Sequence, residues 1–173
     1  MTVNYKFGYT IKRGVIMKKT NALRHLDADG IAYETFEYDG DVEVDGVKIA
    51  ELNNLPVDAV FKTLVAEGKD KAHFVFVIPV ADELDLKKAA KVCGEKKMEM
   101  LHVKDLLPLT GYVRGGCSPV GMKKLFPTYI HESAILYDAI YVSAGKKGLQ
   151  MRVDPEDLRR LIKGEFADLT KEG

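Results

Sequence analysis

Residues 115–121, Gly-Gly-Cys-Ser-Pro-Val-Gly, carry the strongest chemical signal in this chain. Three glycines and one proline in seven positions do not fit a regular helix or strand, so the segment is predicted to be a loop. Because glycine has no Cβ, backbone N–H groups of such a loop can point into one concavity. There they can bind a phosphate, a carboxylate or a polarised carbonyl. The alternative interpretation is a tight surface turn without a ligand.

Lys62 and Tyr38 are the main candidate site residues outside this loop. Strand alternation puts Lys62 on the same face as Val60 and Leu64, so it is either an edge-strand lysine that discourages aggregation or a charge held in a pocket. In a pocket its ammonium could hold a phosphate or a ribose oxygen. Tyr38 precedes an Asp-Gly turn, where its phenol could line a site or pack half-buried with its hydroxyl in water.

Neither a protein nucleophile nor a metal centre is indicated. Ser118 lacks the Gly-x-Ser-x-Gly context of a nucleophile, and its hydroxyl is predicted to hold the loop instead. Cys117 could attack as a thiolate, but no base lies near it in the sequence. The four histidines show no metal-ligand spacing, so we predict no metal site.

Three lysine pairs lie close to glycine-rich turns. They are Lys96-Lys97, Lys123-Lys124 and Lys146-Lys147. Such pairs are usually solvated, but here they could form a local surface that touches phosphates.

Helices and strands interleave irregularly along the chain. Helices are predicted over 20–30, 46–54, 85–94 and 154–164, and strands over 31–38, 60–66, 73–80, 128–131, 139–143 and 149–153. The strands over 60–66 and 73–80 are expected to form a hairpin, and residues 98–107 are ambiguous between strand and helix. This order predicts an α+β fold in which a mixed sheet, or a partly closed barrel, has helices outside it.

Composition sets the remaining limits. The 173 residues suit one domain, and 46% are hydrophobic, as in ordinary globular proteins. Twenty-six basic residues balance twenty-six acidic ones, which argues against strong, sequence-blind binding to a long duplex. No apolar run approaches the roughly 20 residues that span a bilayer, so no membrane partner is expected. Two isolated cysteines favour a cytoplasmic location. We interpret residues 1–16 as an extension or disordered segment, and residues 17–173 as one domain.

Several sequence blocks together resemble the YbaK/EbsC-type aminoacyl-tRNA deacylases. In order, the blocks are Lys62-Thr63-Leu64, residues 79–91, 96–100, 110–121 and 141–148. The resemblance covers about residues 18–169 without a large gap and is closest to the bacterial YbaK group. It implies a fold similar to the editing domain inserted in bacterial prolyl-tRNA synthetases.

The resemblance also implies an activity. Members of this family hydrolyse Cys-tRNA(Pro), and less selectively Cys-tRNA(Cys), without a cofactor, a metal or a protein nucleophile. The thiol of the substrate is thought to attack its own ester carbonyl. The implied partners are the acceptor end of an aminoacyl-tRNA and prolyl-tRNA synthetase in a ternary complex. The sequence leaves the oligomeric state open.

The roles of individual residues follow from the same resemblance. Lys62 matches the essential lysine that holds the terminal adenosine end, and Tyr38 matches a pocket tyrosine. Gly116 matches the glycine whose backbone faces the aminoacyl group, and Ser143 matches a serine on the opposite wall. Lys62 and Gly116 are thus the expected catalytic residues.

The loop and its departures from the family pattern complete the expected site. Gly115, Ser118 and Pro119 belong to the same glycine loop and are expected to bind substrate. Cys117 stands where the family is usually aliphatic, and Gln150 replaces an acid seen in some relatives, which puts a catalytic carboxylate there in doubt. Two other functions stay open: a deacylase for another small aminoacyl ester, such as Ala-tRNA(Pro), and a non-catalytic tRNA- or synthetase-binding module.

Overall fold

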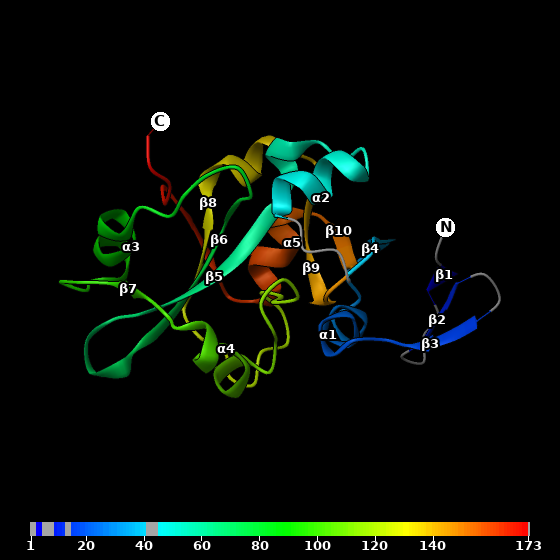
Figure 1. The fold of residues 1–173 in the computed structure, drawn as a ribbon, viewed down its shortest axis with the longest axis horizontal. Helices are drawn as coiled ribbons and strands as arrows, with labels where there is room; N and C mark the ends of the chain where they lie inside the picture. Colours follow the sequence, from blue (N-terminus) through cyan, green and yellow to red (C-terminus); the bar gives the residue numbers. More distant parts are fainter. Residues whose placement is uncertain (1–2, 5–8, 13–14, 41–44, 173) are drawn as a thin grey trace.

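The computed structural model of this protein describes residues 3–4, 9–12, 15–40 and 45–172. At the N-terminus, β1 (Val3–Asn4), β2 (Tyr9–Lys12) and β3 (Val15–Lys18) pair as a three-stranded antiparallel sheet. Figure 1 shows this sheet to one side of the remaining elements. The assignment of residues 1–16 as an extension stays a prediction, and part of that segment lies outside the described residues.

A small antiparallel sheet contains the strands that frame the C-terminal half. Its order is β4 (Tyr33–Glu37), β10 (Leu149–Val153) and β9 (Ile140–Lys146). The β9–β10 hairpin turns through Gly148, which has a φ of +86°. A register shift between Leu149 and Gln150 marks an irregularity in the hairpin. All three strands lie within the ranges predicted from the sequence, apart from the last residues of β9.

The second sheet is larger and mixed. Its order is β11 (Glu165–Ala167), β8 (Thr128–His131), β6 (His73–Pro79), β5 (Phe61–Glu67) and β7 (Glu99–Met100). The predicted β5–β6 hairpin is confirmed, while β8 runs parallel to β6 and β11 parallel to β8. Strand β11 was not predicted, because only three residues of extended chain follow the stop of the preceding helix.

The two sheets meet at one point. Val60, just before β5, forms an isolated parallel bridge with Tyr141 of β9. The mixed α+β architecture predicted from the sequence is therefore present. Closure of the strands into a barrel is not seen among the described residues, because the two sheets are hydrogen-bonded in separate orders.

Five α-helices accompany these sheets within the described chain. They are α1 (Asn21–Ala28), α2 (Gly46–Leu52), α3 (Leu86–Cys93), α4 (Val103–Thr110) and α5 (Pro155–Leu161). The four predicted helices are all present, and the ambiguous stretch 98–107 divides into β7 and the start of α4. Short 3-10 helices occupy Val57–Ala59, Lys69–Lys71 and Glu132–Leu136.

Side-chain caps explain why the predicted helices begin where they do. Thr20 accepts a hydrogen bond from the N–H of Leu23 at the start of α1. Asp85 and Asp154 accept backbone N–H bonds at the starts of α3 and α5. Each cap satisfies amide groups that the first helical turn leaves without intrahelical partners.

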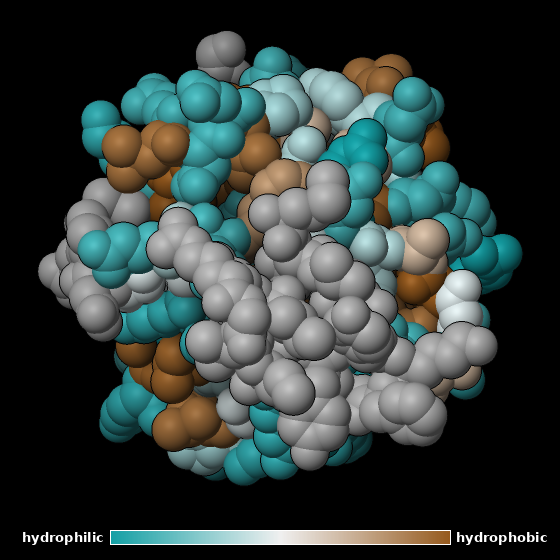
Figure 2. All heavy atoms as spheres, turned by 90° about the vertical axis from the view of Figure 1, so that its right-hand side faces the viewer, coloured by the Kyte–Doolittle hydropathy of each residue, from teal (hydrophilic) through white to brown (hydrophobic). Residues whose placement is uncertain are grey.

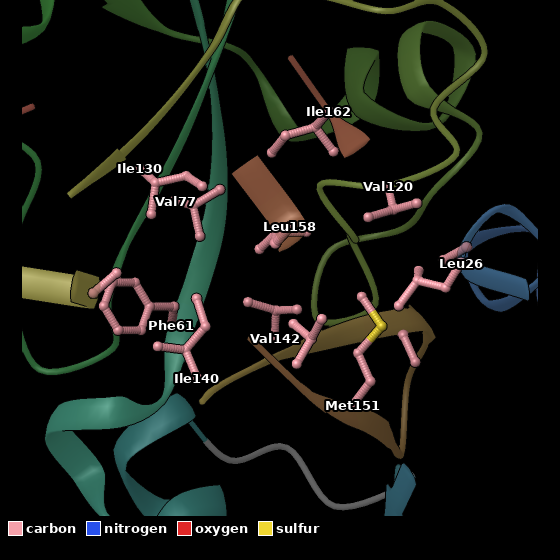
Figure 3. Packing of buried hydrophobic residues seen from close by; sticks show 14 of the residues in the cluster. Leu26, Phe61, Val77, Val120, Ile130, Ile140, Val142, Met151, Leu158 and Ile162 are labelled. Atoms are coloured by element: carbon pink, nitrogen blue, oxygen red, sulfur yellow. The ribbon is translucent and has the colours of Figure 1, made fainter. Parts of the chain in front are cut away.

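The main hydrophobic core lies between the two sheets (Figure 3). Phe61 and Val77 enter it from the large sheet, and Val142 and Met151 enter it from the small sheet. Helices α1 and α5 contribute Leu23, Leu26 and Leu158, the residue that follows α5 contributes Ile162, and the glycine-rich loop contributes Val120. The loop is therefore fastened to the core by a side chain of its own.

The remaining surface is mixed. On the face seen in Figure 2, hydrophilic residues surround separate hydrophobic areas. Among the described residues, the helices are too short and too polar for any of them to cross a membrane.

Candidate functional site

Residues 115–121, here called the glycine loop, are anchored at their C-terminal end by two hydrogen bonds. The hydroxyl of Tyr112 donates to the carbonyl of Val120. Asn21, the first residue of α1, donates from Nδ2 to the carbonyl of Gly121 at 2.8 Å. Residues 116–120 are buried. A tight turn on the surface would not need this burial, so the loop is an integrated part of the fold.

Ser118 and Pro119 support the loop from within. Ser118 is completely buried, and its Oγ accepts a hydrogen bond from the N–H of Val120 at 3.2 Å, as predicted for a loop-holding hydroxyl. Pro119 is buried as well. Their burial leaves little side-chain surface for a substrate, so any contact with one must come mainly from the backbone of the loop.

Gly116 packs against the turn that joins β9 and β10. A Cβ added to Gly116 would lie 2.8 Å from the backbone N of Lys147 and 3.0 Å from the carbonyl carbon of Lys146. Backbone atoms cannot move aside as a flexible side chain can, so only glycine fits here. The loop and the hairpin turn are thereby held in fixed relative positions.

The structure limits which amides of the loop could bind a ligand. The N–H of Gly116 donates to the carbonyl of Val113 at 3.0 Å, and the N–H of Val120 is bonded to Ser118. The sequence-based expectation of a loop with amides free for a ligand is therefore wrong for these two groups. The backbone group that Gly116 can still offer is its carbonyl oxygen.

Tyr38 reaches the glycine loop from the small sheet. Its N–H donates to the carbonyl of Gly148 at 2.9 Å, which continues the β4–β10 pairing beyond Glu37. Its hydroxyl lies 3.5 Å from the carbonyl oxygen of Gly115, a long and weak hydrogen bond. The structure thus brings together Tyr38 and the loop, as the resemblance implied.

One face of the small sheet points away from the main core. Val142 and Met151 point into the core, so their neighbours along β9 and β10 point to the opposite side. Register pairs Gln150 with both Ser143 and Phe36, which places these three side chains on that opposite side. With Tyr38 and Tyr141 they form what we call the site face: Phe36, Tyr38, Tyr141, Ser143 and Gln150.

Lys62 belongs to the same face by register. Val60 pairs with Tyr141 in a parallel bridge, so Lys62 and Ser143, each two residues further on, point to the same side. The neighbouring Phe61 points into the main core, as Figure 3 shows, which leaves Lys62 on the opposite side. Among the described residues, no hydrogen bond joins Lys62 to the glycine loop; the Nζ of Lys62 donates to the carbonyl of Val80 at 3.4 Å.

The edge-strand interpretation of Lys62 does not fit the sheet. Strand β5 lies between β6 and β7, and its start is joined to β9 through Val60. On the face of Lys62, Leu64 packs in a second apolar cluster under α3, and Val60 packs in a third one under α2. The lysine thus stands between two apolar clusters, half-buried.

Burial shifts the acid–base behaviour of Lys62. It lowers the pKa of Lys62, because a low-dielectric surrounding disfavours the ammonium form. The negative charges of Asp82, Glu83 and Asp45 oppose this shift and favour the ammonium. These three acidic residues lie in loops or at a helix end. Their spacing in the sequence does not predict that they lie close to Lys62 in the fold.

Cys117 is not suited to nucleophilic attack. Burial raises the pKa of its thiol to about 12, so the thiolate is scarce near neutral pH. Its position in the buried part of the loop agrees with a packing role.

Sequence reasoning missed two aromatic residues and left the state of Gln150 open. Phe36 and Tyr141 make an edge-to-face contact, with ring centroids 5.5 Å apart, on the site face. Alternation with Tyr38 was the available signal for Phe36. Gln150 is buried, and within the described part of the chain its Oε1 has no hydrogen-bond partner.

Comparisons with known proteins identify the family. Residues 44–161 match the family described as the aminoacyl-tRNA editing domain. The match spans well over half of the chain, and the chain therefore belongs to this family. This confirms the resemblance inferred from the sequence blocks.

A similar curated protein and solved structures agree with this assignment. The chain is 47% identical over 154 residues to EbsC of Enterococcus faecalis, a protein assigned as a Cys-tRNA(Pro)/Cys-tRNA(Cys) deacylase; the match covers 88% of this chain and 94% of that protein. A crystal structure assigned as a trans-editing enzyme for prolyl-tRNA synthetase has a TM-score of 0.76 at 22% identity, covering 88% of this chain and 96% of the other. The hypothetical protein APE2540 has a TM-score of 0.78 at 17% identity, covering 88% and 100%. At these identities the two structures establish the fold.

Proposed function

We propose that this protein is a trans-editing deacylase that removes cysteine from mischarged Cys-tRNA(Pro), and less selectively from Cys-tRNA(Cys). Membership of the editing-domain family and 47% identity to EbsC support the activity and the substrate. The need for it is physical: cysteine and proline are close in size, and pocket fit alone separates such ligands by only about 10–200-fold. A second site must therefore clear the errors of the synthetase.

The observation that carries this proposal is the composition of the site face. A half-buried ammonium at Lys62 shares it with Tyr38 and Ser143, next to a rigid glycine loop, while the loop thiol is protonated. These groups can position a substrate and stabilise charge. We further propose that the two sheets act as one partly closed, barrel-like sheet across the Val60–Tyr141 junction.

In the proposed reaction, the substrate supplies its own nucleophile. The cysteine sulfur forms a bond to its ester carbonyl carbon, and the bond from that carbon to the ribose oxygen breaks. The thiol proton passes to the departing ribose oxygen, so the products are a cyclic thiolactone and uncharged tRNA. Such a step needs placement and charge stabilisation from the protein, rather than a protein nucleophile.

Each residue of the site has a proposed role in that step. Lys62 holds the terminal adenosine end of the tRNA, and Tyr38 lines the pocket. The carbonyl of Gly116 accepts a hydrogen bond from the substrate ammonium, since its N–H is already engaged. Ser143 forms the opposite wall. We also propose that the protein works in the cytoplasm, in a ternary complex with tRNA and prolyl-tRNA synthetase; failure of the three to co-migrate on a native gel would count against the complex.

A deacylation assay with several charged tRNAs tests the activity. We expect rapid loss of cysteine from tRNA(Pro), with Ala-tRNA(Pro) and Pro-tRNA(Pro) spared. If alanine is lost faster than cysteine, the substrate is Ala-tRNA(Pro), a smaller ester without a thiol, and the proposal of a cysteine substrate is wrong. Binding without hydrolysis of any of these esters would make the protein a binding module.

Lys62→Ala tests the site. We expect its turnover of Cys-tRNA(Pro) to be at least about 100-fold lower, because the ammonium that positions the substrate is gone. Lys91→Ala, an exposed lysine of α3, is the matched control and should keep wild-type turnover. Wild-type turnover in Lys62→Ala would remove Lys62 from the mechanism.

A further inference from the structure

The two chain segments that form the glycine loop and the β9–β10 hairpin carry only positive charge. Residues 111–126 and 140–153 contain six lysines and arginines and no aspartate or glutamate. The whole chain, by contrast, has 26 residues of each sign. Arg152 is paired with Glu34 at 3.7 Å. The other five are exposed, and we call them the basic collar: Arg114, Lys123, Lys124, Lys146 and Lys147.

The fold gathers the basic collar around the glycine loop. The side chain of Lys147 lies over Gly115, with Cε 3.5 Å from where a Cβ would be. The backbone of Lys146 and Lys147 contacts Gly116, directly after Arg114 and Gly115. Two segments far apart in the sequence therefore place cations at one rim, beside the loop and Tyr38.

The second lysine pair is tied to the same rim. Lys123 follows Gly121, donates its N–H to the carbonyl of Thr110 at 3.0 Å, and packs its side chain against Gly111. Its Nζ donates to the carbonyl of Pro108 in the last turn of α4 at 3.2 Å, and the Nζ of Lys124 lies over the ring of Phe126, 5.9 Å from its centroid.

The charges of the basic collar are not spent on carboxylates. Among the described residues, the ion pairs of lysine involve Lys19, Lys48, Lys88, Lys97 and Lys171, none of which belongs to the collar. Glu37 and Asp39, at the adjoining strand end, both have interactions of their own. Within the part of the chain that the structure describes, the collar cations have no carboxylate partners and are available to an anionic ligand.

The opposite end of the site has the reverse charge. Asp45, Asp82 and Glu83 act on Lys62 there, and of these Glu83 is also ion-paired with Lys171 at 3.0 Å. A polyanion that enters the site is attracted at the loop end and repelled beyond Lys62, so the two ends define a direction of entry.

Resting on the proposed function, we propose that the basic collar binds the phosphate backbone at the acceptor end of the tRNA. The acceptor strand crosses the rim over the glycine loop and ends with its terminal adenosine at Lys62. Contacts with phosphates position a nucleic acid without reading its sequence, which suits an enzyme that leaves tRNA selection to a partner. A chain with no net charge can bind a polyanion in this way because its positive and negative residues lie at opposite ends of one site.

Charge-removing variants test this assignment. Lys146→Gln/Lys147→Gln and Lys123→Gln/Lys124→Gln remove the charge but keep the Cβ–Cδ part of each side chain, whose Cγ atoms pack over Gly115 and Gly111. The matched control is Lys69→Gln/Lys71→Gln, an exposed pair at the β5–β6 turn, which Figure 1 shows at the lower-left end of the large sheet, away from the β9–β10 hairpin. Circular dichroism and thermal unfolding check that each variant folds.

The main readout is binding of uncharged tRNA(Pro), measured by fluorescence anisotropy across a series of KCl concentrations. Each collar pair should weaken binding about tenfold at low salt and reduce the slope of log K against log salt by about 1.5, since each lost phosphate contact removes about 0.7–0.9. In single-turnover deacylation, each collar variant should raise the concentration of Cys-tRNA(Pro) needed for the half-maximal rate more than it lowers the maximal rate. The control pair should leave the salt slope as in the wild type.

Three outcomes decide the proposal. Wild-type affinity and salt slope in both collar variants would overturn it. Retained tRNA binding together with lost binding of purified prolyl-tRNA synthetase would also overturn it, because the collar would then dock a protein. If the wild-type protein hydrolyses none of the charged tRNAs, but its tRNA binding still depends on the collar, the proposed activity fails while the collar assignment stands.

Discussion

The glycine-loop end and the Lys62 end of the site face are held by different forces. The loop is fixed by packing: residues 116–120 are buried, Val120 enters the core, and Gly116 touches backbone atoms of the β9–β10 turn. Lys62 is held by one long hydrogen bond to Val80 and by the field of nearby carboxylates. The loop end has one permitted geometry, whereas the lysine end has an adjustable charge.

This difference separates what each end contributes. A packed backbone positions the aminoacyl group, and small displacements are costly because the surrounding atoms cannot follow. A half-buried ammonium, by contrast, is governed by the balance between burial and neighbouring charge. Steric changes should therefore damage the loop end most, and changes of charge or pH should act at the lysine end.

The largest effect of a steric change is expected from Gly116→Ala. The new Cβ would lie 2.8 Å from the backbone N of Lys147, so the loop or the turn must shift. A displacement of about 1 Å in a positioning element can lower turnover about 100-fold, and we expect a loss of that size in kcat/KM. Steady-state deacylation of Cys-tRNA(Pro) measures it.

A matched glycine separates the steric effect from general destabilisation. Gly94→Ala imposes strain at a φ of +71°, but its Cβ would meet no atom within 4 Å. It should lower the melting temperature while keeping turnover close to wild type. Equal turnover in the two alanine variants would contradict the view that the loop end depends on a fixed geometry.

The next effect concerns pH at the lysine end. If the ammonium of Lys62 is the active form, kcat/KM falls as the pH rises through the pKa of Lys62. Asp82→Asn removes a negative charge that raises the pKa of Lys62, so this pKa drops further. The alkaline limb of the pH profile, where kcat/KM falls, then moves to lower pH. The pH profile of deacylation, corrected for spontaneous ester hydrolysis, gives the shift, and NMR titration of the Lys62 Cε gives the pKa directly.

Asp70→Asn serves as the control for this shift. Asp70 is an exposed carboxylate in the 3-10 turn between β5 and β6, remote from the acids that act on Lys62. Removing its charge should change neither the alkaline limb of the pH profile nor the pKa of Lys62 measured by NMR. Movement of the limb to higher pH in Asp82→Asn would reverse the assigned sign and exclude the ammonium as the active form.

The sequence predicts the features of this site that depend on local patterns, but not those that depend on long-range contacts. The strands β5 and β6, the capped helices α1, α3 and α5, and the loop over 115–121 follow from local patterns, because alternation, caps and glycines act over a few residues. Family blocks then assigned roles to Lys62 and Gly116. These predictions concern which residues matter, and they need no knowledge of distant contacts.

Long-range contacts were beyond that kind of reasoning. The bridge from Val60 to Tyr141, which puts Lys62 on the site face, joins residues 81 positions apart. The engaged N–H of Gly116 depends on the local path of the loop, which the glycines permit but do not specify. The acids around Lys62 converge only because α2 and the end of β6 pack together.

A smaller effect is expected from Tyr38→Phe, which tests the contact between the small sheet and the loop. Its hydroxyl lies 3.5 Å from the carbonyl of Gly115, so little hydrogen-bond energy is lost. We expect kcat/KM to fall no more than about tenfold, near 1 kcal/mol for a weak neutral hydrogen bond. Tyr137→Phe, a partly buried tyrosine that packs on the main core, is the control. A loss as large as that of Gly116→Ala would mean that the phenol contacts the reacting atoms.

The smallest effect on turnover is expected from Cys117→Ala. The thiol is buried inside the loop, and its pKa of about 12 keeps it protonated, so it takes no part in bond making. Removing the sulfur should cost roughly 1–2 kcal/mol of stability through lost packing, measured by urea unfolding, while deacylation stays within about twofold of wild type. Slow alkylation of the native thiol by iodoacetamide at neutral pH should accompany this. Loss of deacylation in a folded Cys117→Ala variant would mean that the Cys117 thiol is a nucleophile. The loop end would then take part in bond making, and would not act only by positioning the substrate.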